Sequence, residues 1–404
     1  MAGRYRGPLH GVPIAVKDLC FTKGFPTMGG MQVLKNHVPA FDATVVSRLA
    51  AAGAVLLGKL NTAEGAQAAY HPDFEVTLNP WDTTRWAGAS SSGSASATAA
   101  GLCFGALGTD TLGSIRFPSA CCGVVGLKPT YGRVSRFGVL PLAESLDHIG
   151  PMARSSKDVA IILASIAGSD VNDPTSLPGS VPSMLEGIET GVSGLRIGFD
   201  EEYATQGVAA GVRAAVSDVL ALMEELGAHV VPVQLPPFDR SAASLIAGTE
   251  AVLSHSSTYP SQRDLYGPWF REYLDRYSMV TGAEYANAHN ARLKFQGAFR
   301  RVMAEVDALV CPTMPFVGFT ASPERLKGTW DEVNSLFPPG DTGMFARPFN
   351  MSGSPTICFP CGFSQEGLPY SVQFVGKHLD EALLCRIGYA YEQMTNWHIR
   401  HPSV

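Results

Sequence analysis

Two serines in glycine-rich turns, and one lysine at the end of an apolar run, are the residues of this sequence best suited to chemistry. Ser90 and Ser114 each lie in such a turn, and Lys17 follows the apolar run Val12–Val16. A serine hydroxyl becomes a nucleophile only when a base takes its proton, and a lysine can do this only where burial keeps it neutral. Because a buried ammonium after Val12–Val16 would be costly, the sequence favours a neutral lysine base.

Each of these residues also has an ordinary structural interpretation. The segment Ser90–Ser96 fits a flexible polar turn, Lys17 fits an exposed lysine at a strand end, and Ser114 fits a helix cap. Taken one at a time, these structural interpretations are the better ones.

The turn Gly108–Ser114 could supply a second catalytic component. Backbone N–H groups in such a turn can converge on one point and stabilise an oxyanion. The turn has the glycine spacing of a phosphate-binding loop, but the lysine that should follow Gly113 is missing. The sequence also lacks a Gly-x-Ser-x-Gly motif, a His-x-x-x-His pair and a cysteine–histidine cluster at ligand spacing. We therefore expect neither a nucleotide, nor a metal, nor any other cofactor.

The composition is that of a soluble globular protein with a large core. Of 404 residues, 46% are hydrophobic and 16% are charged, and the net charge is −6. This acidic balance disfavours a nucleic acid or an anionic membrane as partner. The eight cysteines are too sparse for a disulfide scaffold, and no apolar stretch is long enough to span a membrane or to act as a leader at the N-terminus. We expect a cytoplasmic protein.

The elements that position these residues alternate between strand and helix. A short strand, Gly11–Asp18, carries Lys17 at its end. Asp42 is expected to cap a helix that is followed by a buried strand, Ala54–Leu57. The small-residue segment Ala95–Leu107 suits a helix packed closely against a sheet.

The second half predicts more of the same sheet. A strand, a helix and a strand at Leu195–Phe199, Val208–Leu226 and His229–Val233 form a βαβ unit. Residues 240–306 are mostly helical in pattern, and their aromatic residues are expected to pack rather than line a mouth. The closing elements are strands at Asp307–Cys311, Ser354–Cys361 and Tyr370–Val375 and a helix at Leu379–Thr395.

Taken together, the motifs of this chain resemble those of the amidase signature family. The resemblance runs through nearly the whole chain and is carried by segments in the family's order: Gly11–Asp18, Lys59–Asn61, Asn79–Trp81, Gly88–Ser94, Gly108–Pro118, Gly123–Ser135 and Gly367–Gly376. The sequence departs from the common pattern at three positions, because Ala89, Ser92 and Leu112 stand where glycine is usual. We expect Leu112 to alter substrate shape rather than to abolish activity.

The resemblance implies a Ser–cis-Ser–Lys triad. It makes Ser114 the nucleophile, Ser90 the bridging serine after a cis peptide bond, and Lys17 the base. The implied oxyanion hole is formed by backbone N–H groups of the nucleophile's turn. Among the candidate substrate-binding residues, the cation Arg347 is the first to test as a ligand for a substrate carboxylate, although an ordinary structural salt bridge is the favoured role. The oxyanion-hole residues are Thr111, Leu112 and Gly113 with Ser114, and the substrate-binding candidates are Ala66, Ser91, Phe117 and Arg347.

The resemblance also implies the architecture. We expect an α/β fold in which a large mixed β-sheet is flanked by helices on both faces, with residues 1–404 forming a single domain. Within it, residues 8–170 hold the signature core, residues 195–350 hold the βαβ extension and the substrate loops, and residues 354–395 hold the closing strands and helix. A homodimer is compatible with this architecture.

Three functions are weighed. The leading one is an amidohydrolase that cleaves C–N bonds of small-molecule amides, anilides or carbamates through a serine acyl-enzyme. The alternative is the glutamine-hydrolysing A subunit of a tRNA-dependent amidotransferase, a branch of the family that the segment Gly126–Ile149 resembles. A non-catalytic family member is the third, but Lys17, Ser90 and Ser114 are all present.

Overall fold

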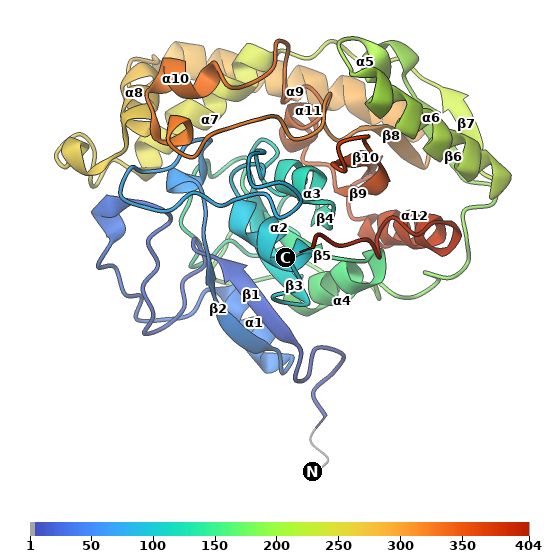
Figure 1. Cartoon of the computed structure of the whole chain (residues 1–404), viewed down its shortest axis with the longest axis horizontal. Helices are drawn as coiled ribbons and strands as arrows, with labels where there is room; N and C mark the ends of the chain where they lie inside the picture. Colours follow the sequence, from blue (N-terminus) through green and yellow to red (C-terminus); the bar gives the residue numbers. More distant parts are fainter. Residues whose placement is uncertain (1–4, 404) are drawn as a thin grey trace.

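The computed structural model describes residues 5–403, and its centre is one mixed sheet (Figure 1). Ten strands lie in the order β2-β1-β3-β5-β4-β9-β10-β8-β6-β7. At both ends of the sheet neighbouring strands run parallel, whereas in the middle, from β3 to β8, they run antiparallel. The strands are β1 (Pro13–Lys17), β2 (Val55–Leu60), β3 (Gly105–Asp110), β4 (Val125–Lys128), β5 (His148–Ala153), β6 (Arg196–Phe199), β7 (His229–Pro232), β8 (Ala308–Pro312), β9 (Thr356–Phe363) and β10 (Pro369–Gly376).

Helices flank this sheet, and several of them begin with clear sequence signals. Ser155 caps α4 by accepting a hydrogen bond from the Asp158 N–H, and Thr281 forms a capping box with Glu284 at the start of α9. The helices are α1 (Thr44–Ala51), α2 (Ser92–Ala99), α3 (Arg116–Cys122), α4 (Ser156–Ile166), α5 (Glu201–Thr205), α6 (Ala210–Glu225), α7 (Arg240–Ser254), α8 (Pro268–Tyr277), α9 (Gly282–Ala304), α10 (Trp330–Asn334), α11 (Arg347–Met351) and α12 (Glu381–Met394).

The sheet is apolar on both faces, and helices cover each face. Along β8, Val310 packs into one cluster with α1, α4, α6 and α12, while its neighbours Leu309 and Cys311 pack into another with α7, α9 and α11. Side chains that alternate along a strand point to opposite faces, so the two clusters are the two sides of the sheet. The predicted α/β fold, a large mixed sheet flanked by helices on both faces, is confirmed.

Several predicted elements are found close to their expected positions. The βαβ unit appears as β6, α6 and β7, with β6 and β7 parallel and joined to the same sheet. The helical region 240–306 contains α7, α8 and α9, and its aromatic residues Tyr266 and Phe270 are buried as expected. Trp269 is also buried but lines a cavity, so the expectation that these residues only pack is wrong for Trp269. The three closing strands and the last helix appear as β8, β9, β10 and α12.

Three local predictions are wrong. Asp42 does not cap α1, because its carboxylate accepts the Lys23 N–H and α1 begins without a side-chain cap. The expected buried strand is the edge strand β2, whose residues Val55 and Leu57 are 48% and 53% exposed. The expected helix 95–107 ends at Ala99, because the chain turns there and enters β3. Hydrophobicity alone cannot tell an edge strand from a central one.

None of the helices described between residues 5 and 403 is long and apolar enough to cross a membrane. The first four residues, part of the stretch in which no leader is expected, lie outside the described residues.

Replacing Phe359 with alanine should lower the free energy of unfolding by about 3–5 kcal/mol, the usual cost of emptying a buried aromatic site. Phe359 is fully buried on β9, with its ring 5.7 Å from that of Phe374 and 5.0 Å from that of Tyr391. Denaturant titration of both proteins measures the change. Val171→Ala, at a position that is 96% exposed, is the control and should leave the midpoint unchanged; equal midpoints for both variants would contradict this packing.

Candidate active site

Three chain segments meet at one edge of the sheet and bring the predicted triad residues together. Lys17 is the last residue of β1, and Ser114 lies in the turn that connects β3 to α3. Because β1 and β3 are parallel neighbours, their carboxyl ends lie side by side. Ser90 lies in the turn that leads into α2, which packs against β3.

The Lys17 side chain is completely buried and ends among three hydroxyl groups. Its Nζ lies 2.7 Å from Ser90 Oγ, 3.0 Å from Ser91 Oγ and 2.8 Å from Thr109 Oγ1. The Ser91 hydroxyl donates its own hydrogen to the Thr109 carbonyl, 3.1 Å away, so it can only accept from Lys17. A neutral lysine therefore gives its two N–H bonds to Ser91 and Thr109 and turns its lone pair toward Ser90.

Burial lowers the pKa of Lys17 to about 7, because the ammonium loses its hydration in the interior. The side chains of Cys20, Asp147 and Asp110 act in the opposite direction but do not cancel the effect of burial. Near neutral pH a large fraction of Lys17 is therefore uncharged and able to accept a proton from Ser90.

The turn that carries Ser90 is held from several sides. The peptide bond between Ala89 and Ser90 is cis. The Ser90 carbonyl accepts a hydrogen bond from the Thr62 hydroxyl at 2.9 Å. Gly88 has φ +82°, and a Cβ there would lie 2.4 Å from the Pro118 Cα, so only glycine fits at this position.

Of the three predicted triad residues, Ser114 is the one that faces open space. It is half-buried and lines a cavity of about 430 Å³. The Ser91 N–H donates to the Ser114 carbonyl at 3.2 Å, which ties the two serine turns together. Within residues 5–403 the Ser114 hydroxyl has no hydrogen-bond partner, and a relay from Ser90 would have to close when substrate binds.

A buried ion pair holds the turn that carries Ser114 in place. Both carboxylate oxygens of Asp110 bind the Arg116 guanidinium at 3.0 Å, and the Asn350 amide donates to Asp110 at 2.8 Å. Burial is the largest single influence on the pKa of Asp110 and would raise it. The charge and hydrogen bonds of Arg116, the Lys128 charge and the Asn350 hydrogen bond together outweigh burial and hold this pKa well below its usual range. Asp110 and Arg116 are both fully buried, so this ion pair fixes the position of the turn.

The Asp110 carboxylate also decides which N–H groups of this turn are free. It accepts the Gly113 N–H at 2.8 Å and the Ile115 N–H at 3.1 Å. Gly113, one of the expected oxyanion-hole residues, is therefore engaged in this structure. The N–H groups of Thr111, Leu112 and Ser114 have no acceptor among the described residues and remain as donors.

Leu112, where glycine is usual, fits its position without strain. It is absent from the residues with positive φ, so this site does not require glycine. Its side chain lines the cavity of Ser114 and also packs against the cluster that contains Phe345 and Phe349. It therefore shapes the wall of the cavity.

Several aromatic side chains line the cavity around Ser114. Trp269 on α8 and Trp330 on α10 stack with ring centroids 5.1 Å apart, and Phe117 lies nearby on α3. Among the predicted substrate-binding residues, Ala66, Phe117 and Arg347 line the cavity. Ser91 does not line it, because this residue is fully buried and hydrogen-bonded to Lys17 and Thr109.

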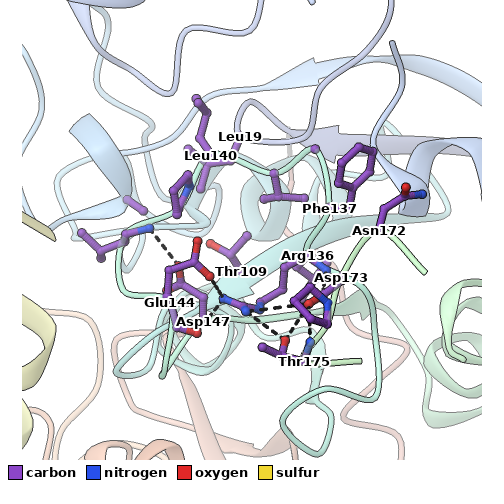
Figure 2. A pocket seen from close by; sticks show the side chains of 17 residues that line it. Leu19, Thr109, Arg136, Phe137, Leu140, Glu144, Asp147, Asn172, Asp173 and Thr175 are labelled. Carbon is purple, nitrogen blue, oxygen red and sulfur yellow. Dashed lines mark hydrogen bonds and ion pairs between the residues drawn. The ribbon is translucent and has the colours of Figure 1, made fainter. Parts of the chain in front are cut away.

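A second cavity, of about 360 Å³, shares the lining residues Ala66 and Leu142 with the cavity of Ser114 (Figure 2). Thr109 and Asp147 line it, and Figure 2 shows Arg136 on its wall, with dashed contacts to neighbouring polar side chains. Asp147 accepts a hydrogen bond from the Thr111 hydroxyl at 2.5 Å, and burial raises the pKa of this carboxyl to about 6. Asp147 therefore lines the second cavity and is hydrogen-bonded to Thr111, in the turn that carries Ser114.

Sequence reasoning did not single out Thr109, Asp147 and Asn350. Thr109 and Asp147 lie inside two of the family-like segments, Gly108–Pro118 and Gly126–Ile149, so their motif context was the available signal. Asn350 has no such signal. In the part of the chain that the structure describes, no group of three or more His, Cys, Asp or Glu residues is arranged to hold a metal ion.

The rate at which a sulfonyl fluoride labels Ser114 should rise with pH and level off above pH 7. Lys17 has a pKa of about 7 and acts as a base only when neutral, so protonation below that pH removes the base. Mass spectrometry of the intact protein measures labelling across the pH range. In Lys17→Met the labelling should be slow and independent of pH over this range. If the variant showed the same pH profile of labelling as wild type, Lys17 would be excluded as the base.

Comparison with known proteins agrees with the resemblance. The family model described as Amidase matches residues 1–385. The chain is 44% identical over 405 residues to the Mycobacterium tuberculosis protein named "Putative amidase AmiD", covering 100% of this chain and 84% of that one. It is also 40% identical over 429 residues to the A subunit of the Glutamyl-tRNA(Gln) amidotransferase of Chloroflexus aurantiacus, covering 100% and 86%.

A solved structure gives the same result for the fold. Native peptide amidase from Stenotrophomonas maltophilia superimposes with a TM-score of 0.83 at 32% sequence identity, covering 97% of this chain and 84% of that one. The match of the family model over most of the chain, the identity to relatives along the whole chain and the shared fold agree with one another. The chain belongs to the amidase family, whose activity is hydrolysis of C–N bonds.

Proposed function

We propose that this protein is an amidohydrolase that cleaves C–N bonds of small-molecule amides, anilides or carbamates through an acyl-enzyme on Ser114. The observation that carries the proposal is the buried Lys17 amine, 2.7 Å from Ser90 Oγ, together with Ser114, whose carbonyl accepts the neighbouring Ser91 N–H and which lines a cavity. The same observation argues against a non-catalytic family member, because a base with a pKa of about 7 serves no evident structural purpose.

In the proposed acylation, neutral Lys17 takes the Ser90 proton while Ser90 takes the Ser114 proton, and Ser114 Oγ bonds to the carbonyl carbon. The C–N bond then breaks, and the proton returns through Ser90 to the leaving nitrogen, which departs as a neutral amine. In deacylation, water gives its proton to the same relay, and its oxygen bonds to the acyl carbon. The bond between Ser114 Oγ and the acyl carbon breaks, and Ser114 regains its proton.

The negative charge on the carbonyl oxygen needs donors that are in place beforehand. The N–H groups of Thr111, Leu112 and Ser114 fit this role, since they have no acceptor among the described residues. In comparable enzymes one such donor is worth about 2.7–4 kcal/mol of transition-state stabilisation. The Gly113 N–H, also expected to take part, would first have to leave Asp110.

The second candidate is the glutamine-hydrolysing A subunit of a tRNA-dependent amidotransferase. The 40% identity to the corresponding Chloroflexus aurantiacus protein over the whole chain favours it. The composition of the cavity speaks against it, because the aromatic walls suit an uncharged group better than the polar end of glutamine. Glutaminase activity that appears only with partner subunits would identify this second candidate.

We further propose a cytoplasmic enzyme that works on small molecules without a nucleic acid, a membrane or a cofactor, with a homodimer as the assembly to test. The acidic net charge of −6 and the eight buried, unpaired cysteines support this setting.

Ser114→Ala should abolish amide hydrolysis while leaving the fold intact. The test panel contains an anilide, a primary aliphatic amide, glutamine and an aryl carbamate, and the readout is amine or ammonia release. Wild type should turn over the anilide or the carbamate and form a covalent adduct on Ser114 that mass spectrometry detects. Equal turnover by wild type and variant would show that Ser114 is not the nucleophile.

Thr111→Val should lower kcat by roughly tenfold or more with little change in KM, if the hydroxyl contact to Asp147 holds one oxyanion donor in place. Thr111→Ser keeps a hydroxyl and is the matched control, with kcat near that of wild type. Steady-state kinetics on the best amide of the panel measure both. A loss confined to thermal stability, with kcat unchanged, would reduce Thr111 to a structural role.

A further inference from the structure

The cavity of Ser114 carries very few formal charges, and they cluster at one place. Of the residues that line it, only Arg240, Asp341 and Arg347 are charged at neutral pH. Arg240 is 62% exposed, and its guanidinium lies 3.8 Å from the Asp341 carboxylate, so water screens this cation. Arg347 is only 23% exposed and is the cation that a bound substrate meets.

Arg347 has a fixed position relative to the nucleophile. It is the first residue of α11, and its predecessor Ala346 accepts a hydrogen bond from Arg116 at 3.0 Å. A Cβ on Gly113 would lie only 2.9 Å from the Ala346 Cβ, so this segment packs directly on the turn of Ser114. Arg347 therefore belongs to the part of the cavity wall that packs on the turn of Ser114.

Asp341 lines the same cavity and already pairs with the Arg347 guanidinium. Its carboxylate forms an ion pair and a hydrogen bond with the Arg347 guanidinium, and it also accepts the Gly343 N–H at 3.0 Å. A carboxylate at the end of a substrate's acyl chain would have to displace Asp341, or approach Arg347 with Asp341 beside it. Either route costs free energy that an uncharged acyl chain avoids.

We propose that Asp341 is a specificity-determining residue that neutralises Arg347, so that the cavity takes amides with an uncharged acyl chain and rejects those ending in a carboxylate. This inference rests on the proposed function, because it concerns the substrate of the same site. It assigns Arg347 a role different from the carboxylate ligand expected for a glutamine-type substrate.

The same two charges could instead bind a zwitterion, with Arg347 on the carboxylate and Asp341 on the ammonium of glutamine. That arrangement requires the existing contact between Arg347 and Asp341 to open, together with the bond from Gly343. The closed pair favours the uncharged substrate, and the zwitterion is an outcome of the test.

The test compares three 4-nitroanilides whose acyl chains have the same length. Valeryl 4-nitroanilide is uncharged, glutaryl 4-nitroanilide ends in a carboxylate, and γ-glutamyl 4-nitroanilide carries a carboxylate and an ammonium. We expect wild type to prefer the valeryl compound. Asp341→Asn, which keeps the shape and an acceptor for Gly343, should raise the glutaryl-to-valeryl ratio of kcat/KM by about tenfold.

Two further variants separate charge from folding. Asp341→Asn combined with Arg347→Met should return the ratio toward that of wild type, because the unmasked cation is gone. Asp264→Asn removes the acid of another Arg–Asp pair, with Arg271 at 3.8 Å, outside the cavity lining, and should leave the ratio unchanged. A ratio unaffected by Asp341→Asn would overturn the proposal, as would a wild-type preference for the γ-glutamyl compound that Asp341→Asn abolishes.

A binding readout keeps this inference separate from the proposed function. Valeramide and the monoamide of glutaric acid compete with the sulfonyl fluoride for Ser114, and protection from labelling reports binding without turnover. Valeramide should protect the wild-type protein from labelling. The glutaric monoamide should protect Asp341→Asn more strongly than it protects wild type. If no nitroanilide or other amide is hydrolysed, the proposed function fails, whereas equal protection by both ligands in both proteins overturns only the role of Asp341.

Discussion

The site depends on the cost of holding a positive charge on Lys17 inside the protein. Within residues 5–403 no carboxylate lies at ion-pair distance from its Nζ, whose partners are three hydroxyl groups. Lys59, on the neighbouring strand β2, shows the contrast, since it pairs with Asp18 at 3.0 Å. Hydroxyl groups solvate an amine but do not compensate an ammonium, so the environment of Lys17 selects the basic form.

This arrangement works only if the acids nearby are already occupied. Asp110 follows Thr109 in the chain and raises the pKa of Lys17, and without a cation of its own it would stabilise a charged lysine more strongly. Instead Arg116 and Asn350 bind it, and the same carboxylate fixes the turn of Ser114. One buried ion pair therefore performs two tasks: it fixes the turn that carries Ser114, and it weakens the influence of a carboxylate on the Lys17 amine.

The sequence was sufficient for the parts of the site that lie within short motifs. Lys17, Ser90 and Ser114 stand at strand ends or in glycine-rich turns. Taken singly they favoured ordinary structural interpretations, and it was the resemblance of the combined motifs to the family that grouped them into one site. The sequence could not find Asn350, which is 240 residues from Asp110 in the chain, or the pairing of Asp341 with Arg347 in an irregular loop. It also made β2 a buried strand, because its apolar residues do not reveal that the sheet ends there.

The short helix α11 carries Asn350 toward the ion pair beneath the nucleophile and Arg347 toward the cavity. Catalytic support and substrate contact thus share one rigid element, while the acid that masks Arg347 belongs to the loop before it. The two are therefore separable: under the proposed function, a change at position 341 would alter which molecules are accepted without touching Asn350 or the ion pair of Asp110 with Arg116. Such a layout keeps the choice of substrate and the chemical step in separate parts of the chain.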